Sequence, residues 1–223
     1  MLVKMFPKNG DVLPEIRFKG FTEDWEEKML CDIGDFKSNG VDKKINPEDY
    51  PVNLLNYMDV YNSKKLNSKN CYKLMQVTAK SIQLSENNVL KNDIFFTPSS
   101  ETPEDIAKVL VIEMSLPNTV YSYHLMRFRP KENIFYSIFP NYVFASDFVR
   151  KQLVFSAQGV QRYVISKPSF EKIKALIPNI IEQEKIAVYF KNLDNQIILL
   201  QTQLEKLNNI KKACFTKMFV AQD

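Results

Sequence analysis

The hydrophobic and polar positions divide the chain into two regions of different kind. Over about residues 11–165, short runs of β-branched and aromatic residues alternate with Asn, Asp, Ser and Pro, which is typical of short strands joined by long loops. A helix is predicted from Ser146 to Phe155 and a helical turn near residues 102–105. The strands we predict are Lys73–Thr78, Ile94–Thr97, Lys108–Met114, Tyr121–Phe128 and Tyr142–Ala145, with a polar loop at Asn62–Asn70. This mixture predicts an α+β fold.

The region after Pro178 contains neither Pro nor Gly as far as Asp223 and is rich in Leu, Ile, Gln, Asn, Lys and Glu. It therefore predicts one long helix. Alternating steps of four and three residues define a seam that is apolar at every position except Lys211, a period typical of a coiled coil. The seam consists of Ile186, Phe190, Leu193, Ile197, Leu200, Leu204, Leu207, Lys211, Cys214 and Met218.

A helix from Glu182 to about Met218 would be roughly 55 Å long, too long to be covered by one side of a domain of about 160 residues. We therefore predict a globular domain at 1–180 and a spacer or dimerisation helix at 181–223. A helix that packs only on its own domain is the alternative.

Composition narrows the class of protein. With 223 residues and 45% hydrophobic content, the chain is expected to fold around a real core and is too short for a large multidomain enzyme. A net charge of +4 permits a polyanionic partner without requiring one. The cysteines, at 31, 71 and 214, are too far apart to indicate a zinc site or a disulfide framework. Because neither a signal peptide nor a long apolar run is present, we expect a cytoplasmic location.

A search for catalytic chemistry favours a binding module. His124 is the single histidine, and a structural role is expected for it. The chain carries no phosphate-binding or dinucleotide-binding glycine motif. The sequence Glu26-Glu27-Lys28 is the one nuclease-like element, and it lacks the companion acidic strand that a magnesium site would need.

Four segments, taken in order, resemble the specificity (S) subunits of type I restriction-modification systems. The first is Pro14-Glu15-Ile16-Arg17-Phe18, followed by Gly20-Phe21 and Trp25. The second runs from Asn92 to Thr102, with Asn92 at a position that is usually glycine. The third runs from Ala157 to Ser166, with Gly159, Arg162 and Ile165-Ser166. The fourth is the helix junction Pro178 to Ala187 with Glu182-Gln183, continued by Leu193-Asp194 and Ile197.

This resemblance implies a non-catalytic target-recognition domain followed by a spacer helix. S subunits usually carry two of each in one chain, so the sequence looks like a half-subunit that pairs with a second copy or with another half. The implied partners are double-stranded DNA, methyltransferase (M) subunits and, through them, restriction (R) subunits. S-adenosylmethionine, ATP and Mg²⁺ would belong to those partners, and this chain would hold no cofactor or metal.

DNA recognition of this kind needs basic residues at phosphates and amide, hydroxyl or arginine side chains at base edges. The predicted phosphate contacts are Lys64, Lys65, Lys69, Arg127, Arg129, Lys131, Arg150, Lys151 and Arg162. The predicted base readers are Ser99, Ser100, Gln158, Gln161 and Arg162. The predicted dimerisation residues are Ile186, Phe190, Leu193, Ile197, Leu200, Leu204, Leu207 and Met218.

Two other hypotheses remain open. The chain could be a coiled-coil interaction scaffold without DNA specificity, which would bind its partner without a steep salt dependence. It could also be a nuclease that uses Glu26, Glu27 and Lys28, which would show as Mg²⁺-dependent cleavage.

Overall fold

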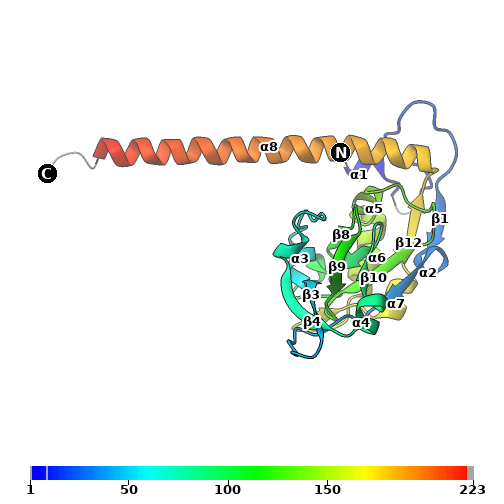
Figure 1. Cartoon of the computed structure of the whole chain (residues 1–223). Helices are drawn as coiled ribbons and strands as arrows, with labels where there is room; N and C mark the ends of the chain where they lie inside the picture. Colours follow the sequence, from blue (N-terminus) through cyan, green and yellow to red (C-terminus); the bar gives the residue numbers. More distant parts are fainter. Residues whose placement is uncertain (1, 9, 220–223) are drawn as a thin grey trace.

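A computed structural model describes residues 2–8 and 10–219, and these form a globular body and a long helix that projects from it (Figure 1). The body mixes short strands with short helices. Helix α8, Ile180–Phe219, lies along one side of the body over its first turns and then extends beyond it. The prediction of an α+β fold with a long C-terminal helix is confirmed.

Two four-stranded sheets form the centre of the body. The first has the order β2-β10-β6-β8, with every neighbouring pair antiparallel. The second has the order β4-β3-β9-β5, in which only β3 and β9 are parallel. The strands are Gly34–Lys37 (β2), Met126–Pro130 (β10), Ile94–Phe96 (β6), Val109–Val111 (β8), Met75–Ala79 (β4), Tyr50–Leu55 (β3), Leu116–Tyr121 (β9) and Asn88–Val89 (β5).

Two further strand pairs and several short helices complete the body. Strand β1, Glu26–Met29, pairs with β12, Lys174–Ile177, and β7, Ser99–Ser100, pairs with β11, Tyr163–Val164. The remaining elements are α1 (Leu2–Met5), α2 (Leu30–Ile33), α3 (Tyr57–Tyr61), α4 (Ser81–Glu86), α5 (Phe139–Val143), α6 (Asp147–Ser156) and α7 (Lys167–Glu171), with 3₁₀ turns η1 (Cys71–Lys73) and η2 (Pro103–Asp105).

The main core lies between the first sheet and helices α5 to α8, and aromatic rings fill it. Phe36 of β2 lies 4.6 Å from Phe128 of β10, measured between ring centroids. Near the helix, Phe6 contacts both Trp25 and Phe190, at 5.6 and 6.2 Å. Aromatic pairs at these separations add to the free energy gained by burying their area. The segment before β1 therefore seals the first turns of α8 into the core.

A buried ion pair fixes the start of α8. Asn179 caps the helix, because its side-chain oxygen accepts from the Glu182 N–H at 3.0 Å. The fully buried Glu182 carboxylate accepts from Nε and Nη2 of Arg17, each at 2.7 Å. Gln183 is also buried and makes side-chain hydrogen bonds to the main chain of residues 134, 136 and 178. Two of the sequence motifs, around Arg17 and around Glu182-Gln183, thus meet in space.

Two predicted strands are wrong. The segment Tyr121–Phe128 contains the end of β9, a turn in which Leu125 N–H donates to the Ser122 carbonyl, and the start of β10. The chain crosses there from one sheet to the other, which a continuous apolar run does not reveal. Residues 142–145 belong to helix α5 and the turn after it, and most of them are buried in the core. The prediction failed because a short apolar run fits a buried helix as well as a strand.

The other predicted elements are confirmed. The predicted strand at 73–78 overlaps β4, those at 94–97 and 108–114 contain β6 and β8, and α6 follows its predicted N-cap Ser146. The helical turn near 102–105 is η2, and a loop follows α3 at residues 62–70. Helix α8 begins at Ile180, one residue before the predicted boundary. Because Ile186 and Ala187 belong to the main core, helix and body share one hydrophobic cluster.

Replacing Arg17 by Met should lower the free energy of unfolding by about 3–5 kcal/mol, because it leaves the Glu182 carboxylate buried without its partner. Urea denaturation followed by circular dichroism measures the change. The control is Lys8→Met, which removes an exposed ion pair with Glu15 and should leave the midpoint unchanged. Equal effects of the two substitutions would show that the buried pair does not hold the junction.

Candidate functional site

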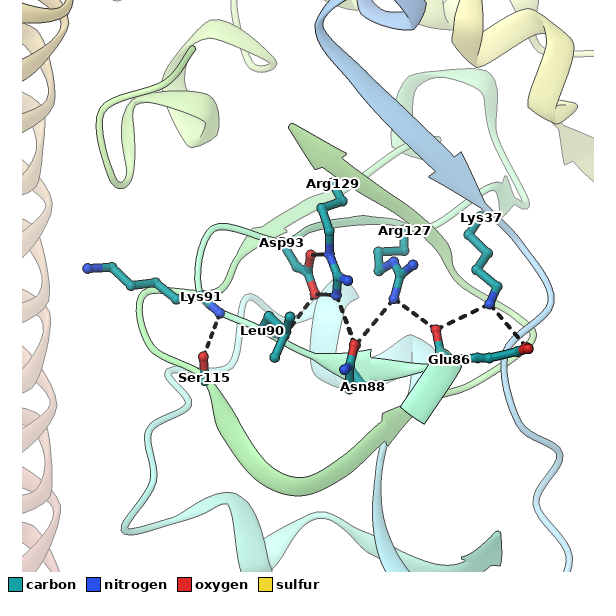
Figure 2. Close-up of polar contacts among 9 residues, drawn as sticks. All are labelled: Lys37, Glu86, Asn88, Leu90, Lys91, Asp93, Ser115, Arg127 and Arg129. Carbon is teal, nitrogen blue, oxygen red and sulfur yellow. Dashed lines mark hydrogen bonds and ion pairs between the residues drawn. The ribbon is translucent and has the colours of Figure 1, made fainter. Parts of the chain in front are cut away.

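Two arginines predicted to contact phosphates, Arg127 and Arg129, make hydrogen bonds within the body (Figure 2). Arg127 is 7% exposed, and its Nη1 donates to the carbonyl oxygens of Glu86 and Asn88, each at 3.3 Å. Arg129 holds the buried Asp93 carboxylate through Nε at 2.6 Å and Nη2 at 2.8 Å. Both arginines tie β10 to the segment before β6. Burial makes the predicted role of Arg127 at phosphates wrong, whereas the role of Arg129, whose side chain is 35% exposed, stays a prediction.

The electrostatics of these arginines agree with a structural role. Burial lowers the pKa of the Arg127 guanidinium, which lies 5.3 Å from the centre of the Tyr121 ring. The hydrogen bond to Asp93 raises the pKa of Arg129. Charges removed from water need such partners. Asp93 therefore neutralises Arg129, whereas Arg127 is held by main-chain carbonyl oxygens.

Arg150 and Lys131 are also held by the main chain. Arg150 donates to the carbonyl oxygens of Glu104 and Ile106, at 2.9 and 2.7 Å, and burial lowers its pKa. It clamps η2 onto α6, and because Arg150 is half-buried its role as a phosphate contact stays a prediction. Lys131 is exposed, and its Nζ donates to the Asp32 carbonyl at 2.8 Å. Lys151 is exposed on α6.

The lysines of the 62–70 loop are presented by a network of asparagines. Asn67 and Asn70 bond the loop to itself: the Asn67 N–H donates to the Asn70 side chain at 2.8 Å, and Asn70 Nδ2 donates to the Lys65 carbonyl at 2.9 Å. Lys65 and Lys69 are exposed, whereas Lys64 pairs with Asp59 at 2.8 Å. The loop therefore offers Lys65 and Lys69 to an anionic partner.

The structure brings most of the predicted base readers together. Strands β7 and β11 pair, so Ser99 lies beside the 158–164 loop. Arg162 Nη2 donates to Ser99 Oγ at 3.0 Å. The loop is closed by reciprocal main-chain hydrogen bonds between Gln158 and Val164, at 3.0 and 2.8 Å. Between these two residues the side chains of Gln161 and Arg162 are exposed, and Val160 is 91% exposed.

Gly159 makes the tight turn of this loop possible. Its φ is +140°, and a Cβ atom there would lie 2.0 Å from the Arg162 carbonyl oxygen. The glycine therefore serves a turn within the loop itself. Ser100, in contrast, is buried, and its hydroxyl donates to the Thr102 carbonyl. Its prediction as a base reader is wrong, because that hydroxyl is used inside the body.

Three residues beside this loop were missed by sequence reasoning. Tyr57 donates its hydroxyl to the Ser99 carbonyl at 2.7 Å. His124 has its pKa lowered first by burial and then by the positive charges of Lys43 and Arg162. The bridge between Val41 and Ser122 brings the segment of Lys43 beside His124, so residues from separate parts of the chain lie near this loop. We call Lys43, Tyr57, Ser99, His124 and residues 158–162 the reading face.

The nuclease hypothesis finds no support in the placement of its residues. Glu26 and Glu27 alternate along β1: Glu26 pairs with Lys28 at 2.7 Å, whereas Glu27 pairs with Lys174 at 2.7 Å. Neighbouring residues of a strand point to opposite faces, so the two carboxylates do not converge. Within residues 2–8 and 10–219, no group of three or more His, Cys, Asp and Glu side chains is placed to hold a metal ion.

The seam of α8 divides into a covered part and an exposed part. Ile186 and Phe190 are 2% and 5% exposed, and the Tyr142 ring lies 5.1 Å from that of Phe190. Their predicted role in dimerisation is therefore wrong, because their own body covers them. Leu193 is half-buried. Beyond it, Ile197, Leu200, Leu204 and Leu207 are 52–63% exposed. The side chain of Met218 lies outside the described residues.

Replacing Gly159 by Ala should open the 158–164 loop, at a cost of about 1–3 kcal/mol, because the new methyl group clashes with the Arg162 carbonyl. Hydrogen exchange of the Val164 amide, which the loop closure protects, measures this opening. Gly20→Ala is the matched control, since Gly20 also has a positive φ (+94°), but a methyl group added there would meet nothing within 4 Å. If both substitutions leave Val164 equally protected, the close contact does not determine the loop.

The chain is similar to known proteins. Residues 22–209 match the family model of the type I restriction modification DNA specificity domain. A relative in Methanocaldococcus jannaschii, named as the putative specificity subunit of the type I restriction enzyme MjaX, is 25% identical over 203 residues. That match covers 88% of this chain and 46% of the relative. The chain therefore spans about half the length of the curated relative that it matches.

Solved structures share the fold. The type I S subunit from M. genitalium aligns with a TM-score of 0.54 and 15% identity, over 90% of this chain and 47% of that one. The HsdS subunit from Thermoanaerobacter tengcongensis aligns with a TM-score of 0.58 and 13% identity, over 99% of this chain and 49% of that subunit. A chain from a study of complex assembly and conformational transition of the type I R-M system aligns with a TM-score of 0.62 and 14% identity. That alignment covers 95% of this chain and 47% of the other.

The family description and the name of the relative both indicate a specificity role and not an enzymatic one. Over the part of the chain that the structure describes, no helix has the length and apolar character of a membrane span. Because the family model matches most of the length of this chain, the chain belongs to the type I restriction-modification DNA specificity family.

Proposed function

We propose that this chain is the sequence-specific DNA-recognition subunit of a type I restriction-modification complex. Its body would read one half of a bipartite target, and α8 would join it to a second copy. The observation that carries the proposal is the exposed 158–164 loop, which is pinned at both ends and holds Gln161 and Arg162 at the surface. Family membership supports the same conclusion.

The side chains of the reading face have the chemistry that base recognition needs. An arginine can donate two hydrogen bonds to guanine, and a glutamine can both donate to and accept from adenine in the major groove. Arg162 is positioned by Ser99, which reduces the entropy lost when the guanidinium is fixed on a base. Val160, at 91% exposure, is suited to contact a thymine methyl group.

Phosphate contacts would come from the lysines that remain exposed. Lys43 lies on the reading face, and Lys65 and Lys69 lie on the 62–70 loop. Each such contact releases counterions from DNA, so binding should weaken steeply as salt rises. A coiled-coil scaffold without DNA specificity would not show this dependence.

The length of α8 sets the separation of the two half-sites. Its 40 residues correspond to roughly 60 Å, which is between one and a half and two turns of B-DNA at about 34–36 Å per turn. An antiparallel pair of identical chains has two-fold symmetry. The proposed homodimer would therefore read a palindromic target, whereas pairing with a different half would give an asymmetric one.

The proposal assigns catalysis to other subunits of a cytoplasmic complex. Methyltransferase subunits would dock on the assembled pair and bring S-adenosylmethionine, and restriction subunits would join through them with ATP and Mg²⁺. The face of α8 opposite the seam is the surface that we assign to the methyltransferase, because the seam is taken by the second helix. That face carries Ile181 and Val188, which are 61% and 46% exposed.

Replacing Arg162 by Ala should weaken binding to the cognate DNA by about 1–3 kcal/mol and relax the choice of one base pair, because a bidentate contact is lost. Fluorescence anisotropy with the methyltransferase present, together with mapping of methylated sites in cells, measures both effects. Lys91→Ala is the control, since Lys91 precedes β6 whereas Ser99 follows it. Unchanged affinity and methylation pattern in the Arg162 variant would remove it from the reading face.

Replacing Leu200 and Leu204 together by Lys should abolish self-association and leave the body folded, because both leucines are exposed on the projecting part of the seam. Light scattering measures the mass, and near-ultraviolet circular dichroism reports on the body. Leu199→Lys, an equally exposed residue off the seam, should leave the mass unchanged. A double variant with the mass of the unaltered protein contradicts pairing through this seam.

A further inference from the structure

Two hydrogen bonds in series lead from helix α3 to the exposed side chain of Arg162. Tyr57 Oη donates to the Ser99 carbonyl at 2.7 Å, and Ser99 Oγ accepts from Arg162 Nη2 at 3.0 Å. Tyr57 belongs to α3, Ser99 to β7, and Arg162 to the 158–164 loop. Three segments that are far apart in the sequence are therefore joined, and Ser99 is the residue common to both bonds.

Helix α3 holds Tyr57 in a fixed place. Asn56 is the N-cap of α3: its side-chain oxygen accepts from the Tyr57 N–H at 2.8 Å, and Asp59 accepts from the Asn56 N–H at 3.0 Å. Such a capping box fixes the first turn of a helix. The Tyr61 ring lies nearly parallel to the Tyr57 ring, with 5.9 Å between the centroids. Tyr57 is thus a rigid support for whatever its hydroxyl contacts.

The main chain of Ser99 is held from two sides. On one side β7 pairs with β11, and the Ile165 N–H donates to the Pro98 carbonyl at 2.9 Å. Because successive carbonyl groups along a strand point to opposite sides, the Ser99 carbonyl is turned away from β11. On that other side it accepts from Tyr57. Ser99 is therefore fixed between β11 and α3, and its hydroxyl is fixed with it.

The bond to Ser99 leaves Arg162 able to recognise a base. A guanidinium carries five N–H donors in a rigid plane, and Nη2 contributes one of its two hydrogens to each of the two forks of the group. A single bond from Nη2 to Ser99 occupies one fork. The other fork stays available, and its two parallel donors match O6 and N7 of guanine. Arg162 is exposed, so a ligand can reach this fork.

We propose that Tyr57 is the positioning residue that directs Arg162, through Ser99, to a guanine of the DNA target. The inference rests on the proposed function and adds a residue outside the 158–164 loop on which the choice of base depends. The Tyr57 hydroxyl is used by the Ser99 carbonyl, so Tyr57 acts through its neighbours and not on the DNA. Burial raises the pKa of this phenol, so the hydroxyl keeps its proton and donates at neutral pH.

A double-mutant cycle on the complex of this chain with its methyltransferase tests the proposal. Mapping of methylated sites gives the target, and the base pair that the Arg162→Ala variant no longer selects marks the guanine. Fluorescence anisotropy then compares duplexes that differ at this base pair alone. Tyr57→Phe should lower the preference for guanine roughly three- to tenfold, because one hydrogen bond is lost. In the Arg162→Ala background the same substitution should change affinity less than about twofold.

Two further variants separate positioning from a general loss of structure. Tyr61→Phe is the matched control, because it removes a hydroxyl from the same helix that contacts Asp105, at 3.4 Å, and not Ser99. It should keep the full preference for guanine. Ser99→Ala removes the bond to Arg162 directly and should lower the preference at least as much as Tyr57→Phe. In Tyr57→Phe the salt dependence of binding should stay unchanged, since no phosphate contact is removed.

The outcomes distinguish failure of this inference from failure of the proposed function. A Tyr57→Phe variant with full preference for guanine overturns the positioning role, as does a loss of affinity that is equal for all duplexes or equal in both backgrounds. A marked base pair without guanine, or an Arg162→Ala variant that still selects every base pair, overturns it as well. All these results leave DNA recognition by the chain intact. Absence of specific, salt-dependent binding by the unaltered complex overturns the proposed function itself.

Discussion

The apolar edge of α8 has to be kept from water, and this requirement organises the molecule. Over the first turns the body supplies the cover: Phe6 and Tyr142 pack around Phe190, and Arg17 closes the helix start through Glu182. From Ile197 onward the edge is exposed among the described residues. Because one continuous helix carries both parts, the packing that fixes the helix to its own body also fixes the direction in which the exposed part of the edge projects.

The basic residues of the chain divide into two groups with different physical roles. Arg127, Arg129 and Arg150 donate to carbonyl oxygens or to a buried carboxylate, which a planar guanidinium with several donors does well. Lys65, Lys69 and Arg162 remain at the surface, where a charge costs little desolvation. The net charge of +4 therefore does not show which basic residues are available to a ligand.

Periodicity over many residues could be read from the sequence, whereas local environment could not. The long helix, its seam and the α+β class follow from repeated spacing, and Gln158, Gln161 and Arg162 share the loop expected of them. The prediction of one strand at Tyr121–Phe128 was wrong because the residue pattern does not show where the chain passes from one sheet to the other. Arg127 and Ser100 were misassigned because burial decides whether a polar group serves the fold or a ligand. Asn92, with φ of +71°, explains why glycine suits that position in similar sequences.

The closure of the 158–164 loop determines which of its residues can be substituted without disturbing the fold. The hydrogen bonds that close it belong to the main chain, and Gly159 supplies the turn. Substitution of Val160, Gln161 or Arg162 therefore leaves the scaffold untouched, since none of their side chains contributes to the core. In the proposed DNA-recognition role, exchange of these three side chains would alter the bases that are read at little cost in stability, so a few point mutations would give a lineage a different recognition sequence.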